Sequence, residues 1–149
     1  MNVKQRISLL DEEEKNDASQ LLCEKLLKLV IIQEAQNLIY YQAMGDEISL
    51  TPFIAVAQKE WKNSITIDVS GNHVALPKEG VIFVPWRAFT LSGKRIGRGG
   101  WWYDKFLQEH PYFQAVGVCF GCQIFPELPQ DAWDITMNEV IYSWPQRGQ

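Results

Sequence analysis

Two continuous apolar runs, Val81–Val84 and Ala115–Phe120, place the strongest limits on how this chain can fold. Such runs are typical of central parallel strands, which are buried on both faces of a sheet, and Pro85 closes the first one. Between them, Trp101–Gln108 has the pattern of a helix that stops before His110-Pro111. The alternation of strands and helices predicts an α/β fold, a three-layer sandwich with a mostly parallel central sheet.

Other segments supply further helices and strands for this architecture. Asp11 and Glu14 have the spacing of a capping box, and the apolar residues after them follow a helical period up to Gln33. Thr51-Pro52 combines a capping residue with proline at the first helical position, and so predicts a second helix. The remaining expected strands are Asn37–Gln42, Ile65–Val69 in a hairpin with His73–Leu76, and Val140–Tyr142, while Trp86–Gly93 and Gly121–Thr136 are expected connections.

The chain of 149 residues is expected to form one domain, residues 1–149, because it shows no internal repeat, low-complexity segment or linker. Its first residues lead into an acidic run, and its three cysteines are an odd number for a disulfide framework, so we expect a cytoplasmic protein. The longest apolar run, Leu26–Ile32, contains Lys28 and is far too short to span a bilayer.

The stretch Lys94–Lys105 is the strongest candidate for a binding site. Its glycines let backbone N–H groups approach an anion, and the helix expected behind them directs the positive end of its dipole toward that anion. Arg95 and Arg98 can add paired contacts to phosphate oxygens. Because the protein carries a net charge of −4, this local cluster favours a small anionic ligand over nucleic acid. The alternative is a glycine-rich surface turn with solvated charges.

Two groups of acidic residues could act beside such a ligand. Asp104 follows the loop directly, and Asp134 lies in a segment that could fold back over the strand ends; with phosphate oxygens and water, two carboxylates would form an octahedral Mg²⁺ site. Asp46 and Glu47 follow a strand, at the end where ligands bind in open α/β sheets. On chemistry alone, a solvated turn is the simpler explanation for Asp46 and Glu47, and Asp134 could equally be a turn or cap residue.

Cys119-Phe-Gly-Cys122 has the spacing of a redox or zinc motif. A redox motif would open a helix after a strand, whereas this pair runs out of a strand toward Pro126. A zinc site would need a second pair of ligands, which Cys23 and two separated histidines do not supply. We therefore interpret the pair as buried strand cysteines.

The binding loop also resembles the signature of a known enzyme family. Arg95-Ile-Gly-Arg-Gly-Gly-Trp-Trp-Tyr-Asp-Lys-Phe-Leu is similar to the R-L-G-x-G-x-G-Y-Y-D-R-x-L motif of the 5-formyltetrahydrofolate cyclo-ligases, also called 5,10-methenyltetrahydrofolate synthetases. Further segments are similar in the same order: Asp46-Glu47-Ile48, Val81–Pro85 with Phe89 and Gly93, Val116–Phe120 with Gln123, and Leu128-Pro129 with Trp133-Asp134. The resemblance covers nearly the whole chain.

The resemblance implies a cyclo-ligase-like fold and the ATP- and Mg²⁺-dependent closure of 5-formyltetrahydrofolate to 5,10-methenyltetrahydrofolate, with release of ADP and phosphate. In that reaction the formyl oxygen is phosphorylated, and a neighbouring amine of the folate attacks the activated carbon and expels phosphate. The implied ATP contacts are Arg95, Ile96, Gly97, Arg98, Gly99, Gly100, Trp101, Trp102 and Tyr103, with Arg95 and Arg98 also catalytic. The implied Mg²⁺ ligands are Asp104 and Asp134, and the implied folate contacts are Gln42 and Glu47.

Trp101 stands where the family motif has its third glycine. A glycine there could adopt a positive φ or allow phosphate to approach the backbone closely, and a tryptophan side chain would hinder both. Two other functions therefore stay open: a catalytically impaired relative that binds nucleotide or phosphate, and a non-enzymatic interaction protein with Trp86, Trp101 and Trp102 as a contact patch. Tyr103 could also be a packing residue that fixes the loop. We expect a monomer that binds a small-molecule substrate, a reduced folate.

Overall fold

The computed structural model describes residues 2–60, 63–67, 76–85, 88–96, 101–128 and 135–145, with the backbone alone at Ile67, Ile96 and Trp101. The helices are α1 (Val3–Ser8), α2 (Glu12–Leu27), α3 (Val30–Gln33), α4 (Thr51–Glu60) and α5 (Trp101–Glu109), with a short 3₁₀ helix, η1 (Gly121–Gln123). The strands are β1 (Asn37–Tyr41), β2 (Asn63–Ile67), β3 (Gly80–Pro85), β4 (Ala88–Phe89), β5 (Arg95–Ile96), β6 (Phe113–Phe120) and β7 (Glu139–Ser143).

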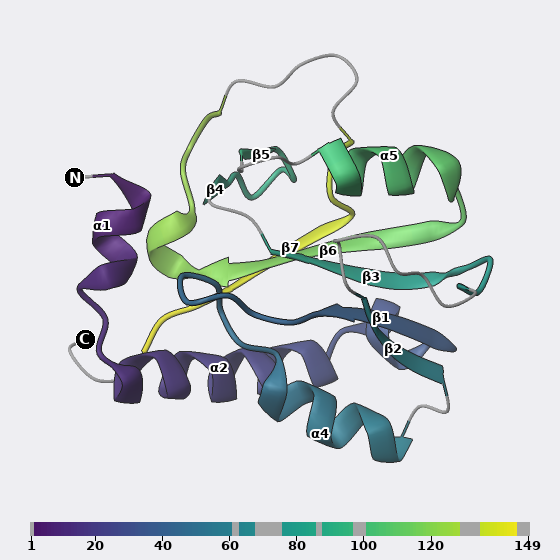
Figure 1. Ribbon diagram of the computed structural model, residues 1–149, viewed down its shortest axis with the longest axis horizontal. Helices are drawn as coiled ribbons and strands as arrows, with labels where there is room; N and C mark the ends of the chain where they lie inside the picture. Colours follow the sequence, from purple (N-terminus) through teal and green to yellow (C-terminus); the bar gives the residue numbers. More distant parts are fainter. Residues whose placement is uncertain are drawn as a thin grey trace.

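Five of the described strands form one parallel sheet in the order β2-β1-β3-β6-β7 (Figure 1). The two apolar runs form β3 and β6, which lie next to each other inside the sheet, and Val81–Val84 are at most 1% exposed. The expected strands at β1 and β7 and the expected helices at α4 and α5 are also present. The prediction of an α/β fold with a mostly parallel sheet is confirmed.

The helices cover both faces of this sheet and so produce three layers. Because side chains alternate along a strand, Val81 and Phe83 pack into the apolar cluster with α2 and α4, whereas Ile82 and Val84 pack into the cluster with α5. Figure 1 shows α2 and α4 below the sheet and α5 above it. The small strands β4 and β5 lie on the same side as α5, and the functional argument concerns that side.

The predicted helix from Asp11 to Gln33 is divided in two, so this prediction was wrong in its extent. Its start is as expected, because Asp11 Oδ1 accepts a hydrogen bond from the N–H of Glu14 (2.7 Å) and Glu14 Oε1 accepts one from the N–H of Asp11 (3.1 Å). After α2 ends, Leu29 takes an extended ψ of 130° before α3 begins. Apolar residues continue the helical period across this break, and the pattern therefore gives no sign of it.

The connection predicted for Trp86–Gly93 contains part of a small hairpin, in which β4 and β5 pair antiparallel. Each of these strands has two residues, which is too short for an alternating pattern to show. The other expected hairpin, between Ile65–Val69 and His73–Leu76, lies largely outside the described residues. The described part of its first strand, β2, pairs in parallel with β1.

Gly93 joins the β4–β5 hairpin to the segment before β7. Its φ is +98°, and its carbonyl accepts a hydrogen bond from the N–H of Met137 (2.9 Å). A Cβ at this position would lie 2.5 Å from the carbonyl oxygen of Met137. Only glycine is compatible with both the positive φ and this close approach.

Replacing Gly93 by alanine is expected to lower the free energy of unfolding by about 2–3 kcal/mol, because the side chain would oppose the backbone conformation and displace Met137. Urea unfolding followed by circular dichroism measures this change. Gly45→Ala is the matched control, since a Cβ at Gly45 would meet no atom within 4 Å, and we expect a change below about 0.5 kcal/mol. Equal losses in both variants would contradict the prediction.

Candidate functional site

Of the residues predicted to bind ATP, those that the structure describes lie on β5 and on the first turn of α5, above the sheet in Figure 1. Arg95 and Ile96 form β5, and Trp101–Asp104 begin α5. Outside the described residues lie Asp134 and the residues that join these two elements, Gly97, Arg98, Gly99 and Gly100. The structure therefore shows the two flanks of the glycine-rich segment.

Arg95 and Asp104 form a buried ion pair between these flanks. Arg95 Nη2 donates to Asp104 Oδ1, and the two side chains are 1% and 12% exposed. Arg95 Nη1 also donates to the carbonyl oxygen of Ile135 (2.6 Å), and the Ile135 N–H donates to the same Asp104 Oδ1 (3.0 Å). We call these residues the Arg95–Asp104–Ile135 cluster. It joins β5, α5 and the segment before β7, and its hydrogen bonds help to stabilise the buried charge pair.

Trp101 occupies an ordinary backbone position. It is the first residue of α5, and within the described residues only Gly80 and Gly93 have a positive φ. The replacement of the motif's third glycine by Trp101 therefore does not force a side chain into a left-handed conformation. Of the two difficulties expected for an indole here, backbone strain does not arise.

The next two residues pack into the α5 side of the fold. Trp102 is half-buried, stacks on Phe106 with ring centroids 5.4 Å apart, and meets Tyr103 edge to face at 5.0 Å. Tyr103 is 6% exposed and belongs to the apolar cluster between α5 and the sheet. This packing agrees with the interpretation of Tyr103 as a residue that fixes the loop. It also leaves Trp102 less available for the contact patch considered above.

The turn after β1 brings Glu47 close to α5. Glu47 is half-buried, and its Oε1 accepts a hydrogen bond from the N–H of Met44 (2.8 Å). Burial raises the pKa of Glu47, although the hydrogen bond from Met44 opposes that rise. Burial also raises the pKa of Tyr103, and the nearby negative charge of Glu47 raises it further. Glu47, an expected folate contact, thus lies close enough to the first turn of α5 for its charge to act on Tyr103.

Two glutamines of the family pattern occupy different environments. Gln42 follows β1 directly and is exposed, so its amide is available at the carboxyl end of the sheet. Gln123 is 2% exposed, and its Oε1 accepts a hydrogen bond from the N–H of Phe120 (2.8 Å). Gln123 therefore supports the end of β6.

Two hydrogen-bonding groups in this region were not identified from the sequence. Ile135 contributes through its backbone N–H and carbonyl, and no side-chain motif can indicate such a contact. The hydroxyl of Tyr41 donates to the carbonyl oxygen of Ile48 (2.6 Å), and burial, followed by the charge of Glu47, raises the Tyr41 pKa. A tyrosine at the carboxyl end of a buried strand, just before an acidic turn, was the available signal for Tyr41.

Cys119 and Cys122 lie against different parts of the core. Cys119 is buried in β6 within the cluster under α5, whereas Cys122 packs against the cluster on the opposite face of the sheet. Both are free thiols, and burial raises the pKa of each. A raised pKa favours the unreactive protonated thiol, in agreement with a packing role.

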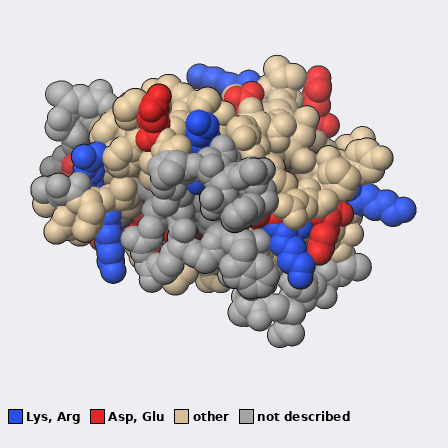
Figure 2. Space-filling view, turned by 90° about the horizontal axis from the view of Figure 1, so that it is seen from above, with Lys and Arg blue, Asp and Glu red and all other residues tan. Residues whose placement is uncertain are grey.

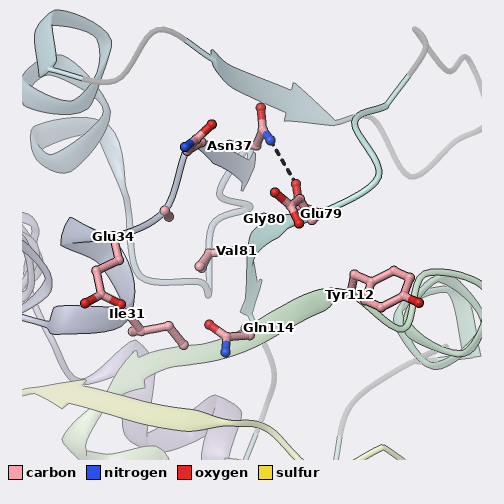
Figure 3. Close-up of a pocket in the computed structure, with 10 residues that line it drawn as sticks. Ile31, Glu34, Asn37, Glu79, Gly80, Val81, Tyr112 and Gln114 are labelled. Carbon is pink, nitrogen blue, oxygen red and sulfur yellow. Dashed lines mark hydrogen bonds between the residues drawn. The ribbon is translucent and has the colours of Figure 1, made fainter.

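A cavity of about 290 Å³ opens at the other end of the sheet (Figure 3). Its polar lining includes Glu34, Asn37, Glu79 and Gln114, and Asn37 Nδ2 donates to the carbonyl oxygen of Glu79 (3.0 Å). These residues lie at the amino ends of β1, β3 and β6, whereas ligands of open α/β sheets bind outside the carboxyl ends. The cavity is therefore separate from the predicted site.

Among the described residues on the face seen in Figure 2, acidic and basic side chains are interspersed. Within the described part of the chain, no helix is both long and apolar enough to cross a lipid bilayer.

Asp104 is chemically suited to hold a divalent cation. Both of its hydrogen bonds use Oδ1, and within the described residues Oδ2 accepts none. That part of the chain holds no group of three His, Cys, Asp or Glu residues that could bind a metal, so further ligands would have to come from outside it. Mg²⁺ is commonly held by one or two carboxylates together with substrate phosphates and water. The available donors therefore fit Mg²⁺ bound together with a nucleotide.

Comparison with known proteins decides the family. The model of the 5-formyltetrahydrofolate cyclo-ligase family matches residues 68–143, about half of the chain. The chain belongs to the 5-formyltetrahydrofolate cyclo-ligase family. The match extends from before β3 to the end of β7, and so includes the glycine-rich segment and the Arg95–Asp104–Ile135 cluster.

Named cyclo-ligases are similar over different shares of the chain. The 5-formyltetrahydrofolate cyclo-ligase of Mus musculus is 27% identical over 181 residues, which cover 94% of this chain and 89% of the mouse protein. That of Haemophilus influenzae is 30% identical over 83 residues, which cover 54% of this chain and 43%, less than half, of that relative. The NMR structure of 5,10-methenyltetrahydrofolate synthetase from Aquifex aeolicus superposes with a TM-score of 0.76 at 27% identity, covering 99% of this chain and 91% of that one. The expected cyclo-ligase-like fold is thereby confirmed.

Proposed function

We propose that this protein catalyses the ATP- and Mg²⁺-dependent conversion of 5-formyltetrahydrofolate to 5,10-methenyltetrahydrofolate, with release of ADP and phosphate. Family membership supports the reaction class. The structural observation that carries the proposal is the proximity of Glu47 to Tyr103. Glu47 belongs to the turn expected to contact the folate, and Tyr103 belongs to the helix that follows the expected ATP loop. A reaction in which ATP activates the folate requires both substrates side by side.

The proposed roles follow from these positions. Arg98 and the N–H groups of Gly97–Gly100 would bind phosphate oxygens in front of α5, whose dipole adds to the attraction. Asp104 and Asp134 would hold Mg²⁺, which supplies neutralisation of the phosphate charge when it is bound. Gln42 and Glu47 would orient the folate so that its neighbouring amine faces the activated formyl carbon. The chemistry asks the protein mainly for positioning and charge stabilisation.

Turnover of 5-formyltetrahydrofolate tests the proposal. With ATP and MgCl₂, we expect formation of the methenyl product, which is measured by its absorbance. In reactions that contain EDTA, we expect no product to form. Calorimetric titration with ATP and Mg²⁺ supplies an independent measure of binding. A protein that neither forms product nor binds ATP at millimolar concentration would refute the proposal.

ATP binding without turnover would instead favour a second candidate function, that of a catalytically impaired family member that binds nucleotide. Trp101 is the observation behind that second candidate, since it replaces a glycine at the start of α5. In that case Trp101→Gly is expected to create activity that the parent protein lacks.

A further inference from the structure

Arg95 directs its guanidinium group toward other parts of the protein. Nη2 pairs with Asp104, and Nη1 donates to the carbonyl oxygen of Ile135 at 2.6 Å. The side chain is 1% exposed. Because the side chain is buried, a nucleotide phosphate could reach this guanidinium only after the surrounding residues had moved.

Asp104 is held through one carboxylate oxygen. Oδ1 accepts from Arg95 and from the N–H of Ile135 (3.0 Å), while Oδ2 accepts no hydrogen bond within the described residues. A carboxylate that is already oriented by hydrogen bonds loses little further freedom when its second oxygen binds a cation.

The same contacts fix the chain in front of β7. Ile135 donates its N–H to Asp104 and accepts from Arg95 through its carbonyl oxygen. Asp134, the second carboxylate proposed for Mg²⁺, directly precedes Ile135 in the chain. The Arg95–Asp104–Ile135 cluster therefore joins the two stretches that carry the proposed metal ligands.

We propose that Arg95 is a positioning residue of the metal site, which aligns Asp104 and the backbone of Ile135. It acts through Asp104 and does not contact the phosphates, unlike the role that the family resemblance implied. Arginine suits this task because its planar fork donates to two partners in fixed directions, whereas lysine is a point charge. This inference rests on the proposed function, and phosphate contacts are left to Arg98 and the glycine N–H groups.

Arg95→Lys separates the two possible roles, positioning of Asp104 and direct contact with phosphate, because it keeps the positive charge and loses the planar guanidinium group. Two affinities are measured: that for ATP in EDTA by calorimetry, and that for Mn²⁺ in the presence of ATP by electron paramagnetic resonance. We expect metal-free ATP affinity to stay within about twofold of the unsubstituted protein and Mn²⁺ affinity to fall about tenfold. The Mg²⁺ concentration for half-maximal turnover should rise by a similar factor, with kcat largely recovered at saturating Mg²⁺.

Comparison variants make the result specific. Arg98→Lys is expected to show the opposite pattern, with weaker ATP binding in EDTA. Lys59→Gln, at an exposed residue of α4 on the opposite face of the sheet, is expected to change neither affinity. If Arg95→Lys does not fold, Arg95→Gln is put through the same measurements.

Weaker metal-free ATP binding in Arg95→Lys, with unchanged Mn²⁺ affinity, would overturn the inference, and so would unchanged behaviour in both assays. These failures concern Arg95 alone, because the unsubstituted protein still binds ATP and Mn²⁺. An unsubstituted protein that binds neither overturns the proposed function and this inference with it.

Discussion

Asp104→Asn is expected to lower kcat/KM for methenyl formation by at least about 100-fold, the scale on which loss of one preorganised electrostatic contact acts. Asparagine has the size of aspartate and keeps an oxygen that can accept from Arg95 and from the N–H of Ile135. It removes the negative charge that the proposed site needs for Mg²⁺. The measurement is initial-rate turnover at saturating ATP and Mg²⁺.

Folding must be checked in the same variant, because Arg95 is left buried beside a neutral partner. We expect a loss of about 1–3 kcal/mol in the free energy of unfolding, which keeps the protein folded at 25 °C. Glu109→Gln, an exposed residue at the far end of α5, is the matched control, and its turnover should stay within about twofold. Undiminished turnover in Asp104→Asn would exclude Asp104 as a metal ligand.

The architecture was predictable where burial leaves a pattern in a single stretch of chain. Val81–Val84 and Ala115–Phe120 are apolar throughout because helices cover both faces of the sheet there. The break at Leu29 could not be predicted, since apolar residues continue on both sides of it. The β4–β5 hairpin is too short to have a period and is fixed by contacts with distant segments, such as that between Gly93 and Met137.

The candidate site was predictable in its residue types and less so in its pairing. A sequence shows that Arg95 and Asp104 are charged, but only the tertiary structure shows that they meet. Glu47 is a similar case. Chemistry alone favoured a solvated turn, and the family resemblance implied a folate contact; the structure half-buries this side chain and places its charge near Tyr103.

Consecutive residues at the start of α5 connect the two halves of the proposed site. Side chains one residue apart on a helix point about 100° apart, so Tyr103 and Asp104 contact different neighbours. Tyr103 lies near Glu47 and the turn after β1, while Asp104 binds Arg95 and Ile135. A shift of this turn would therefore alter the proposed folate and metal contacts together.

Phe83→Ala is expected to have the largest effect on stability, a loss of about 3–5 kcal/mol in the free energy of unfolding. Phe83 is fully buried in β3, and its ring stacks on Tyr40 (centroids 5.8 Å apart) and meets Phe53 edge to face (5.3 Å). Alanine would leave a cavity in the cluster between the sheet and helices α2 and α4. For a domain with a typical stability of about 5–15 kcal/mol, this is a large fraction of the total.

Urea unfolding measures this loss, and an unchanged m-value would show that stability alone has changed. Tyr112→Ala is the matched aromatic control, because Tyr112 is 75% exposed and should cost less than about 0.5 kcal/mol. Phe83 packs toward α2 and α4, on the face of the sheet opposite the Arg95–Asp104–Ile135 cluster. The Phe83→Ala variant should therefore keep its ATP affinity while it remains folded. If its free energy of unfolding falls by no more than that of Tyr112→Ala, the central position of Phe83 in the core is contradicted.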